Sequence, residues 1–200
     1  MADLQVKELT LDQAEKVYRE YLKADFPPEE VKPFSTIRGM WEKKSYCAYG
    51  FYEKAGEDAA DGLCAYAFLM ADHMKRMLLL DYFAVSSQLR GSGYGSKALQ
   101  LLRKECADWN GVVVEVEDDE IPDLDARTRD IRKRRISFYT NAGCRMTTAR
   151  SRLWGVDYRI MVMPLMDLRA EENAAEKVIS VYQCMYEGEI LKKYFEITAE

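Results

Sequence analysis

Three glycines in five positions, Gly91, Gly93 and Gly95, have the spacing in this chain that most directly indicates chemistry. They lie between an almost continuously apolar segment, residues 77–85, and a helical pattern that begins near residue 95. Glycine allows positive φ and a close approach of the backbone to a ligand. The N–H groups at a helix start, together with the helix dipole, attract an anion. The turn therefore predicts a phosphate or pyrophosphate site, and a turn that binds no ligand is the alternative.

Two common nucleotide-binding motifs match this turn poorly. A Walker loop ends in Gly-Lys followed by Ser or Thr, whereas Lys97 follows Ser96 here. A Rossmann fingerprint would combine the glycines with an acidic residue such as Glu115 near the end of the next strand. A Rossmann turn follows its strand almost at once, whereas residues 86–90 intervene here and antiparallel-looking strands precede the turn. A dinucleotide-dependent enzyme nevertheless remains open as an alternative function, and NAD binding would support it.

The stretch from Tyr82 to Gly95, YFAVSSQLRGSGYG, resembles the acetyl-CoA-binding segment of the GNAT superfamily of N-acetyltransferases. The family signature Gln/Arg-x-x-Gly-x-Gly/Ala is matched by Arg90, Gly93 and Gly95, and the preceding strand ends in Ala-Val as in the family. The resemblance implies acetyl-CoA as cosubstrate, bound by the strand end and the turn. The implied contact residues are Phe83, Ala84, Val85, Arg90, Gly91, Ser92, Gly93, Tyr94, Gly95 and Ser96.

A second segment, RISFYTNAGC from Arg135 to Cys144, resembles the later family segment Ala-Ile-x-Phe-Tyr-x-x-x-Gly-Phe. The resemblance assigns to Tyr139 the protonation of the departing thiolate. A phenol with a pKa of about 10 keeps its proton at neutral pH until the thiolate forms. The alternative is that Phe138 and Tyr139 only pack a helix onto the sheet.

The chain departs from the family pattern at three places. Cys144 replaces the usual Phe, which alters packing alone. Arg132 stands where many members have an Asn that contacts the cofactor, so no cofactor contact is carried over to this position. The acidic connection of residues 118–130 is longer than in compact members and suggests a substrate-side loop.

Amine acetylation also needs a group that takes the proton of the amine. Glu115 and Glu117 are candidates because residues i and i+2 of a strand face the same way. The resemblance favours Glu115, for which a solvated carboxylate is the alternative, and Asp81 is a weaker third candidate. The resemblance further implies direct transfer without an acyl-enzyme. The strand end at residues 83–85 would then pair with the pantetheine arm, and its backbone amide would polarise the thioester carbonyl.

The elements that must position these residues follow from apolar periodicity. Strands are expected over residues 4–9, 46–53, 63–70, 77–85, 112–117, 146–154 and 158–163, and helices over 11–26, 34–41, 95–109, 126–141 and 171–194. Gly56–Asp61 should form the turn of the first hairpin. The order predicts an α+β fold with a mixed, mostly antiparallel central sheet flanked by helices, as in GNAT-like acyl-CoA N-acyltransferases, with a C-terminal helical extension.

Residues 1–166 are expected to form the acetyltransferase domain, and residues 167–200 a helical extension packed on the same domain. Three roles stay open for the extension: covering the core, shaping the acceptor cleft, or forming a homodimer. A length of 200 residues accommodates one domain with such an appendage.

The net charge of −5 disfavours nucleic acid as a partner and weakly favours a cationic substrate. The five cysteines are scattered, which fits a reducing cytoplasm. No signal peptide or membrane-spanning run is expected. A metal site and cysteine nucleophilic catalysis are both disfavoured, because the single histidine, His73, lies in a predicted turn.

Together these features predict an acetyl-CoA-dependent N-acetyltransferase that acts on a primary amine of a small molecule or peptide. A non-catalytic acyl-CoA-binding regulatory domain of the same fold is the alternative. The acceptor amine is not identified by the sequence.

Overall fold

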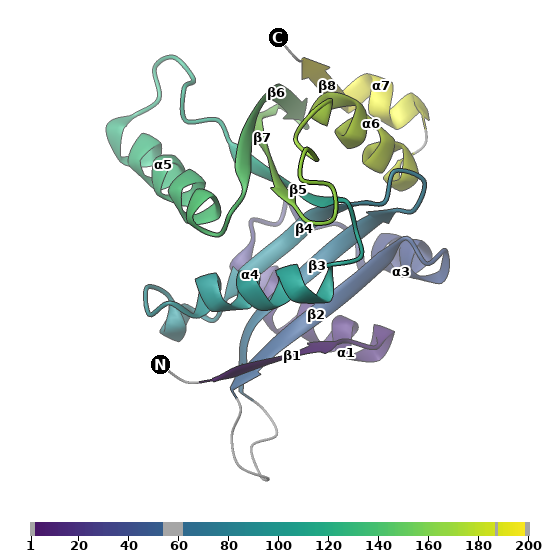
Figure 1. The fold of residues 1–200 in the computed structure, drawn as a ribbon, viewed down its shortest axis with the longest axis vertical. Helices are drawn as coiled ribbons and strands as arrows, with labels where there is room; N and C mark the ends of the chain where they lie inside the picture. Colours follow the sequence, from purple (N-terminus) through teal and green to yellow (C-terminus); the bar gives the residue numbers. More distant parts are fainter. Residues whose placement is uncertain (1–2, 54–61, 187, 199–200) are drawn as a thin grey trace. The chain divides into compact units, whose positions relative to one another are not determined.

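The structure is a computed structural model that describes residues 3–53, 62–186 and 188–198. The expected turn Gly56–Asp61 lies outside the described residues. The strand order is β1-β2-β3-β4-β5-β7-β6-β8, and Figure 1 shows the strands with helices on their faces. Within the described residues, no helix has both the length and the apolar character needed to cross a membrane.

The chain divides into two compact units, the first made of Met1–Ala71 and Leu80–Glu105. Its strands are β1 (Leu4–Glu8), β2 (Tyr46–Glu53), β3 (Leu63–Asp72) and most of β4 (Met77–Val85). Its helices are α1 (Leu11–Val17), a π-helical turn (Tyr18–Leu22), α2 (Lys23–Asp25), α3 (Phe34–Glu42), a 3₁₀ turn (Ser87–Leu89) and α4 (Tyr94–Glu105). Strands β1, β2 and β3 pair antiparallel, and α4 lies across this unit's strands (Figure 1).

A capping box formed by Thr10 and Gln13 begins α1. Thr10 accepts a hydrogen bond from the Gln13 N–H at 3.3 Å, and the Gln13 side chain accepts one from the Thr10 N–H at 2.9 Å. This capping box satisfies two of the N–H groups that a helix start leaves without intrahelical partners. The expected single helix over 11–26 is interrupted by the π turn, after which α2 ends at Asp25.

The second unit comprises Asp72–Leu79 and Cys106–Glu200. Its strands, beyond the first residues of β4, are β5 (Gly111–Glu117), β6 (Arg145–Leu153), β7 (Val156–Pro164) and β8 (Phe195–Thr198). Its helices are α5 (Ala126–Asn141), α6 (Ala174–Met185) and α7 (Gly188–Tyr194). β5 pairs in parallel with Met77–Leu79 of β4 and antiparallel with β7, so one parallel step lies in an otherwise antiparallel order.

The expected α+β class with a mixed, mostly antiparallel sheet is confirmed. The C-terminal segment differs from the single helix expected over 171–194. It forms two helices and then β8, which pairs antiparallel with β6 from Leu153 to Arg150. The alternating residues Phe195, Glu196, Ile197 and Thr198 suit an edge strand, because every second side chain faces the same side. In Figure 1, α6 and α7 lie beside β6 and β8.

Candidate active site

The glycine turn links β4 to α4 through residues 86–93 of the first unit. Gly91 has φ +79° and Gly93 has φ +89°, a region that costs other residues about 1–2 kcal/mol. A Cβ at Gly91 would meet no atom within 4 Å, so this glycine is needed for backbone conformation rather than for space. α4 begins at Tyr94, and the N–H groups of its first turn have no acceptor within the helix. The turn therefore offers backbone donors and the positive end of a helix dipole to an anion.

Arg90, the first residue of the family signature, is held by two contacts. Its Nε donates to the Val85 carbonyl at 3.1 Å, and its Nη2 donates to Asp25 Oδ1 at 2.7 Å. Asp25 Oδ2 accepts a further hydrogen bond from the Tyr66 hydroxyl at 3.0 Å. The Arg90 side chain is still 56% exposed, so donors remain accessible to a second anion. The guanidinium is thus oriented at the end of β4 before any ligand arrives.

The other side chains of the turn have local partners. The Tyr94 hydroxyl donates to Glu53, and this hydrogen bond raises the pKa of Tyr94 to about 12. Ser92 Oγ donates to the Leu89 carbonyl at 2.5 Å. These contacts stabilise the turn. What the turn can offer a ligand is therefore chiefly its backbone N–H groups and the Arg90 guanidinium.

The three candidate bases have different partners. Glu115, in β5, accepts a hydrogen bond from Ser151 Oγ at 2.9 Å on Oε1 and one from the Tyr182 hydroxyl on Oε2. Glu117, two residues on, forms ion pairs with Arg132 at 3.1 Å and with Arg135. Glu115 is thus bound by neutral hydroxyls and Glu117 by two guanidinium groups.

Asp81, the third candidate, lies in β4 in the first unit. It forms an ion pair with Lys32 Nζ at 2.6 Å and accepts a hydrogen bond from the Tyr46 hydroxyl. Burial, followed by the neighbouring Asp81, raises the pKa of Tyr46 well above its ordinary value. Asp81 thus has a lysine and a hydroxyl as partners, whereas Glu117 has two guanidinium groups.

Tyr139 occupies the last full turn of α5 and is buried. Its ring packs edge-on against Phe138 with centroids 5.1 Å apart, and its carbonyl accepts from the Cys144 N–H at 3.0 Å. Burial raises the pKa of Tyr139 above its ordinary value, while the charge of Arg135 acts in the opposite direction. The phenol is therefore neutral at physiological pH. Gly143, at φ +92°, ends the helix as the sequence predicts.

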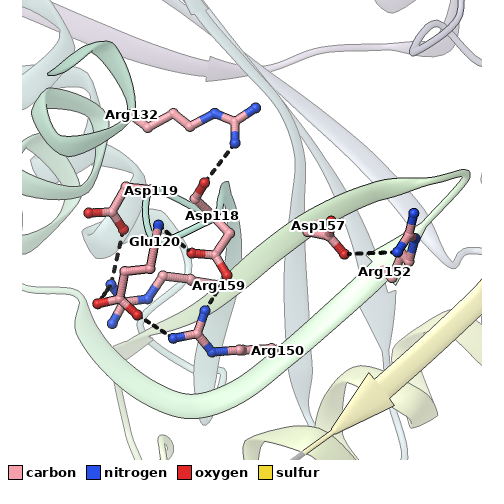
Figure 2. A network of polar contacts seen from close by, with 8 residues as sticks. All are labelled: Asp118, Asp119, Glu120, Arg132, Arg150, Arg152, Asp157 and Arg159. Carbon is pink, nitrogen blue, oxygen red and sulfur yellow. Dashed lines mark hydrogen bonds and ion pairs between the residues drawn. The ribbon is translucent and has the colours of Figure 1, made fainter. Parts of the chain in front are cut away.

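The acidic connection after β5 begins with carboxylates that are held by arginines. Asp118 and Asp119 are buried, and Figure 2 shows why: Arg150 donates to Asp118 and Glu120, and Arg159 donates to Asp119 and Glu120. Buried carboxylates are tolerated because cations pair with them.

Arg132, one of the positions at which the sequence departs from the expected pattern, belongs to the same network. It donates to the Asp118 carbonyl at 2.6 Å, as Figure 2 shows, and pairs with Glu117. This arginine therefore joins α5 to the end of β5, and no cofactor contact is assigned to it.

Sequence reasoning missed three residues that hold the candidates in place: Ser151, Tyr182 and Asp25. They are separated from their partners by 36, 67 and 65 residues. A local pattern carries no information on such distant pairs. Within the arginine network, Arg150 and Arg159 are register partners in the β6–β7 hairpin, so the pairing of these two strands brings both guanidinium groups to the acids that follow β5.

Comparisons with known proteins identify a family for this chain. A family profile described as "Acetyltransferase (GNAT) family" matches residues 14–125, more than half of the chain. No curated protein matches the sequence.

Solved structures share the fold at low sequence identity. A protein from Bacteroides thetaiotaomicron assigned to the GNAT acetyltransferases has 22% identity, covers 90% of this chain and 96% of its own, and has a TM-score of 0.64. The ribosomal-protein-S18-alanine N-acetyltransferase from Escherichia coli has 17% identity over 82% of this chain and 94% of its own, with a TM-score of 0.56. A dodecameric spermidine N-acetyltransferase from Vibrio cholerae has 9% identity, and the match covers 86% of this chain and 98% of its own, with a TM-score of 0.56.

Proposed function

The chain belongs to the GNAT family of acetyltransferases, and from that premise we propose that it transfers an acetyl group from acetyl-CoA to a primary amine of a small molecule or a peptide. The observation that carries the proposal is the glycine turn at the start of α4, with Gly91 and Gly93 at positive φ. Such a turn suits a pyrophosphate, which is the anionic group of coenzyme A nearest its centre.

The binding residues follow from that turn. The first-turn N–H groups of α4, at Tyr94, Gly95 and Ser96, would bind the pyrophosphate, with Arg90 beside them. Residues 83–85, at the end of β4, would pair with the pantetheine arm through backbone groups, and a backbone amide there would polarise the acetyl carbonyl. When bound, acetyl-CoA supplies an acetyl group that its thioester already activates for attack.

We assign the base to Glu115. During transfer the amine nitrogen forms a bond to the acetyl carbon, the carbon–sulfur bond breaks, and the surplus proton of the amine must be accepted. Hydroxyl partners can donate to a carboxylate and accept from a carboxylic acid, so Ser151 and Tyr182 accommodate both forms of Glu115. Glu117 and Asp81 instead form ion pairs, and a cation cannot accept a hydrogen bond from a carboxylic acid.

We assign to Tyr139 the protonation of the leaving thiolate. Its burial keeps the phenol neutral, as a proton donor must be. Each unit by which the pKa of the donor exceeds that of the thiol, about 8.5, costs about 1.4 kcal/mol in the transfer. The cation of Arg135, which lowers the pKa of Tyr139, reduces that cost.

The acceptor is proposed to be cationic. The chain carries a net charge of −5, which attracts a cation. Two fold neighbours are named for acetylating spermidine and the alanine of ribosomal protein S18, both of which present amines. We further propose that residues 167–200 extend a single domain of residues 1–166, that the protein works in the cytoplasm, and that the extension is the site of any homodimer.

A turnover screen tests the proposal. Coenzyme A release is followed with acetyl-CoA and a panel of polyamines, amino acids and peptide N-termini, for the wild type, Glu115→Gln and Tyr139→Phe. Turnover by the wild type that both variants lose, with coenzyme A affinity intact by calorimetry, supports the assignment. Tight coenzyme A binding without turnover of any acceptor would support the regulatory alternative, and NAD binding without coenzyme A binding would contradict both.

A further inference from the structure

Helix α6 lies outside the matched family segment of residues 14–125, yet it contacts a candidate catalytic residue. Its buried face packs through Ala174, Val178, Val181 and Tyr182. Two of its hydroxyl groups also reach carboxylates within the second unit. Ser180 Oγ donates to Asp72 Oδ2 at 2.5 Å, and the Tyr182 hydroxyl donates to Glu115 Oε2. The first carboxylate caps the turn before β4, because Asp72 Oδ1 accepts from the N–H groups of Met74 and Lys75. Only the second belongs to a candidate base.

The ring of Tyr182 is held in place by its neighbours. It is 2% exposed, it lies nearly parallel to the Tyr186 ring at 6.1 Å and 11°, and its centroid is 4.6 Å from that of Phe195. A tyrosine has only two side-chain torsions, and both are restricted by this packing. The hydroxyl therefore reaches Glu115 from a fixed position.

The second donor to Glu115 is also supported by the C-terminal segment. Ser151 is 4% exposed and lies in β6, where it pairs with Tyr158 of β7 on one side and with Ile197 of β8 on the other. β8 therefore completes the sheet around the strand that carries Ser151. Both hydroxyl donors to the carboxylate depend on residues beyond the family match.

We propose that Tyr182 is a positioning residue for Glu115, and that the C-terminal extension is consequently part of the catalytic machinery. The inference rests on the proposed role of Glu115 as base. A carboxylate that must accept a proton from an amine needs a fixed direction, because proton transfer requires a donor–acceptor separation near hydrogen-bond length. Two donors, one on each oxygen, restrict both the position and the rotation of the carboxylate. They also remain compatible with the protonated form, since each hydroxyl can reverse its hydrogen bond.

The test compares two hydroxyl deletions in the same helix of the full-length protein. Tyr182→Phe removes the donor to Glu115, and Ser180→Ala removes the matched donor to Asp72. Each leaves a carboxylate with one donor fewer, half-buried at Glu115 and buried at Asp72, so both should lower the melting temperature. Only Tyr182→Phe should lower kcat, by on the order of tenfold, with the KM for acetyl-CoA unchanged, as expected when a transition-state interaction is lost. Ser151→Ala should also lower kcat, because it removes the other donor to Glu115. It replaces Tyr182→Phe in the test if that variant folds poorly.

A double-mutant comparison separates positioning from general stability. In a Glu115→Gln background, Tyr182→Phe should cause no further loss of kcat, because it acts through the residue already changed. An equal fall in kcat for Tyr182→Phe and Ser180→Ala would overturn the positioning role of Tyr182, and so would an additive loss in the Glu115→Gln background. Either result would leave the assignment of Glu115 as base intact. Full turnover by Glu115→Gln would overturn the positioning role together with the assignment of the base. Absence of wild-type turnover would overturn the proposed function, and the inference with it.

Discussion

Arg90 and Asp25 are joined by an ion pair of 2.7 Å across 65 residues of chain. The pair links the end of α2 to the glycine turn, and the second Arg90 bond, to the Val85 carbonyl, places the guanidinium at the end of β4. An arginine restrained in this way loses less side-chain entropy when it binds a phosphate than a free one does. Its position is thus set by the fold before a ligand binds.

Arg90→Ala is therefore expected to weaken coenzyme A binding about tenfold, which corresponds to about 1.4 kcal/mol for a charge-assisted contact. Arg90→Lys should recover only part of the loss, because an ammonium lacks the planar set of donors that serves Val85, Asp25 and a phosphate together. Lys104→Ala, which removes the same charge from the last turn of α4, is the matched control. Isothermal titration calorimetry measures the coenzyme A affinity of all three variants. Equal losses of affinity at positions 90 and 104 would show that only net charge matters.

Gly91 allows a test of backbone conformation that is free of steric overlap. Because a Cβ there meets nothing within 4 Å, Gly91→Ala should cost only the strain of φ +79°, about 1 kcal/mol in the free energy of unfolding. The control is Gly39→Ala in α3, which is equally open but helical and should gain up to about 1 kcal/mol. Urea unfolding of the two variants gives the comparison. A stabilised Gly91→Ala protein would contradict the assignment of strain to this turn.

Most of the fold could be predicted because its determinants are local. The Thr10–Gln13 capping box, the positive φ of Gly91 and Gly93, and the hairpin turn at Gly155 each depend on a few adjacent residues. The expected helix limits were wrong where distant packing decides the outcome. The C-terminal helix ends at Met185 and resumes at Gly188, and β8 forms because β6 offers it a partner.

The candidate site could be predicted in its residues but not in their partners. Glu115, Glu117 and Asp81 look alike in sequence, since each is a carboxylate in or beside an apolar strand. Their observed partners differ: two hydroxyls donate to Glu115, two guanidinium groups pair with Glu117, and a lysine and a hydroxyl reach Asp81. These groups come from segments up to 67 residues away. Side-chain partners at that separation depend on strand register and helix placement, which periodicity does not define.

Glu115 and Glu117 provide a paired test of that distinction. Glu115→Gln should lower kcat by about 100-fold or more, the usual contribution of a general base, with the KM for acetyl-CoA retained. Glu117→Gln should instead lower stability, because it leaves Arg132 and Arg135 without their common carboxylate. Steady-state kinetics gives kcat and KM for both variants, and thermal unfolding gives their stability. The reverse pattern, with kcat lost only at position 117, would identify the ion-paired residue as the base.

The buried phenols predict that the protein loses stability in alkali. Burial is the first cause that raises the pKa of Tyr46, Tyr66 and Tyr139 above the ordinary value of 10.0. Below that value the phenols are protonated in both the folded and the unfolded chain, so stability is independent of them. Above it the unfolded chain binds fewer protons than the folded chain, so the free energy of unfolding must fall as the pH rises.

Urea unfolding at pH 8, 9, 10 and 10.5 measures this fall, and absorbance at 295 nm reports phenol ionisation directly. Tyr139→Phe should make the alkaline slope shallower, because one of the three phenols no longer takes part. Tyr21→Phe, at a tyrosine that is only partly buried, is the control for the removal of a hydroxyl. Ionisation of all tyrosines near pH 10 without loss of structure would show that these phenols are not enclosed as described. It would also remove the argument that burial keeps the Tyr139 phenol neutral.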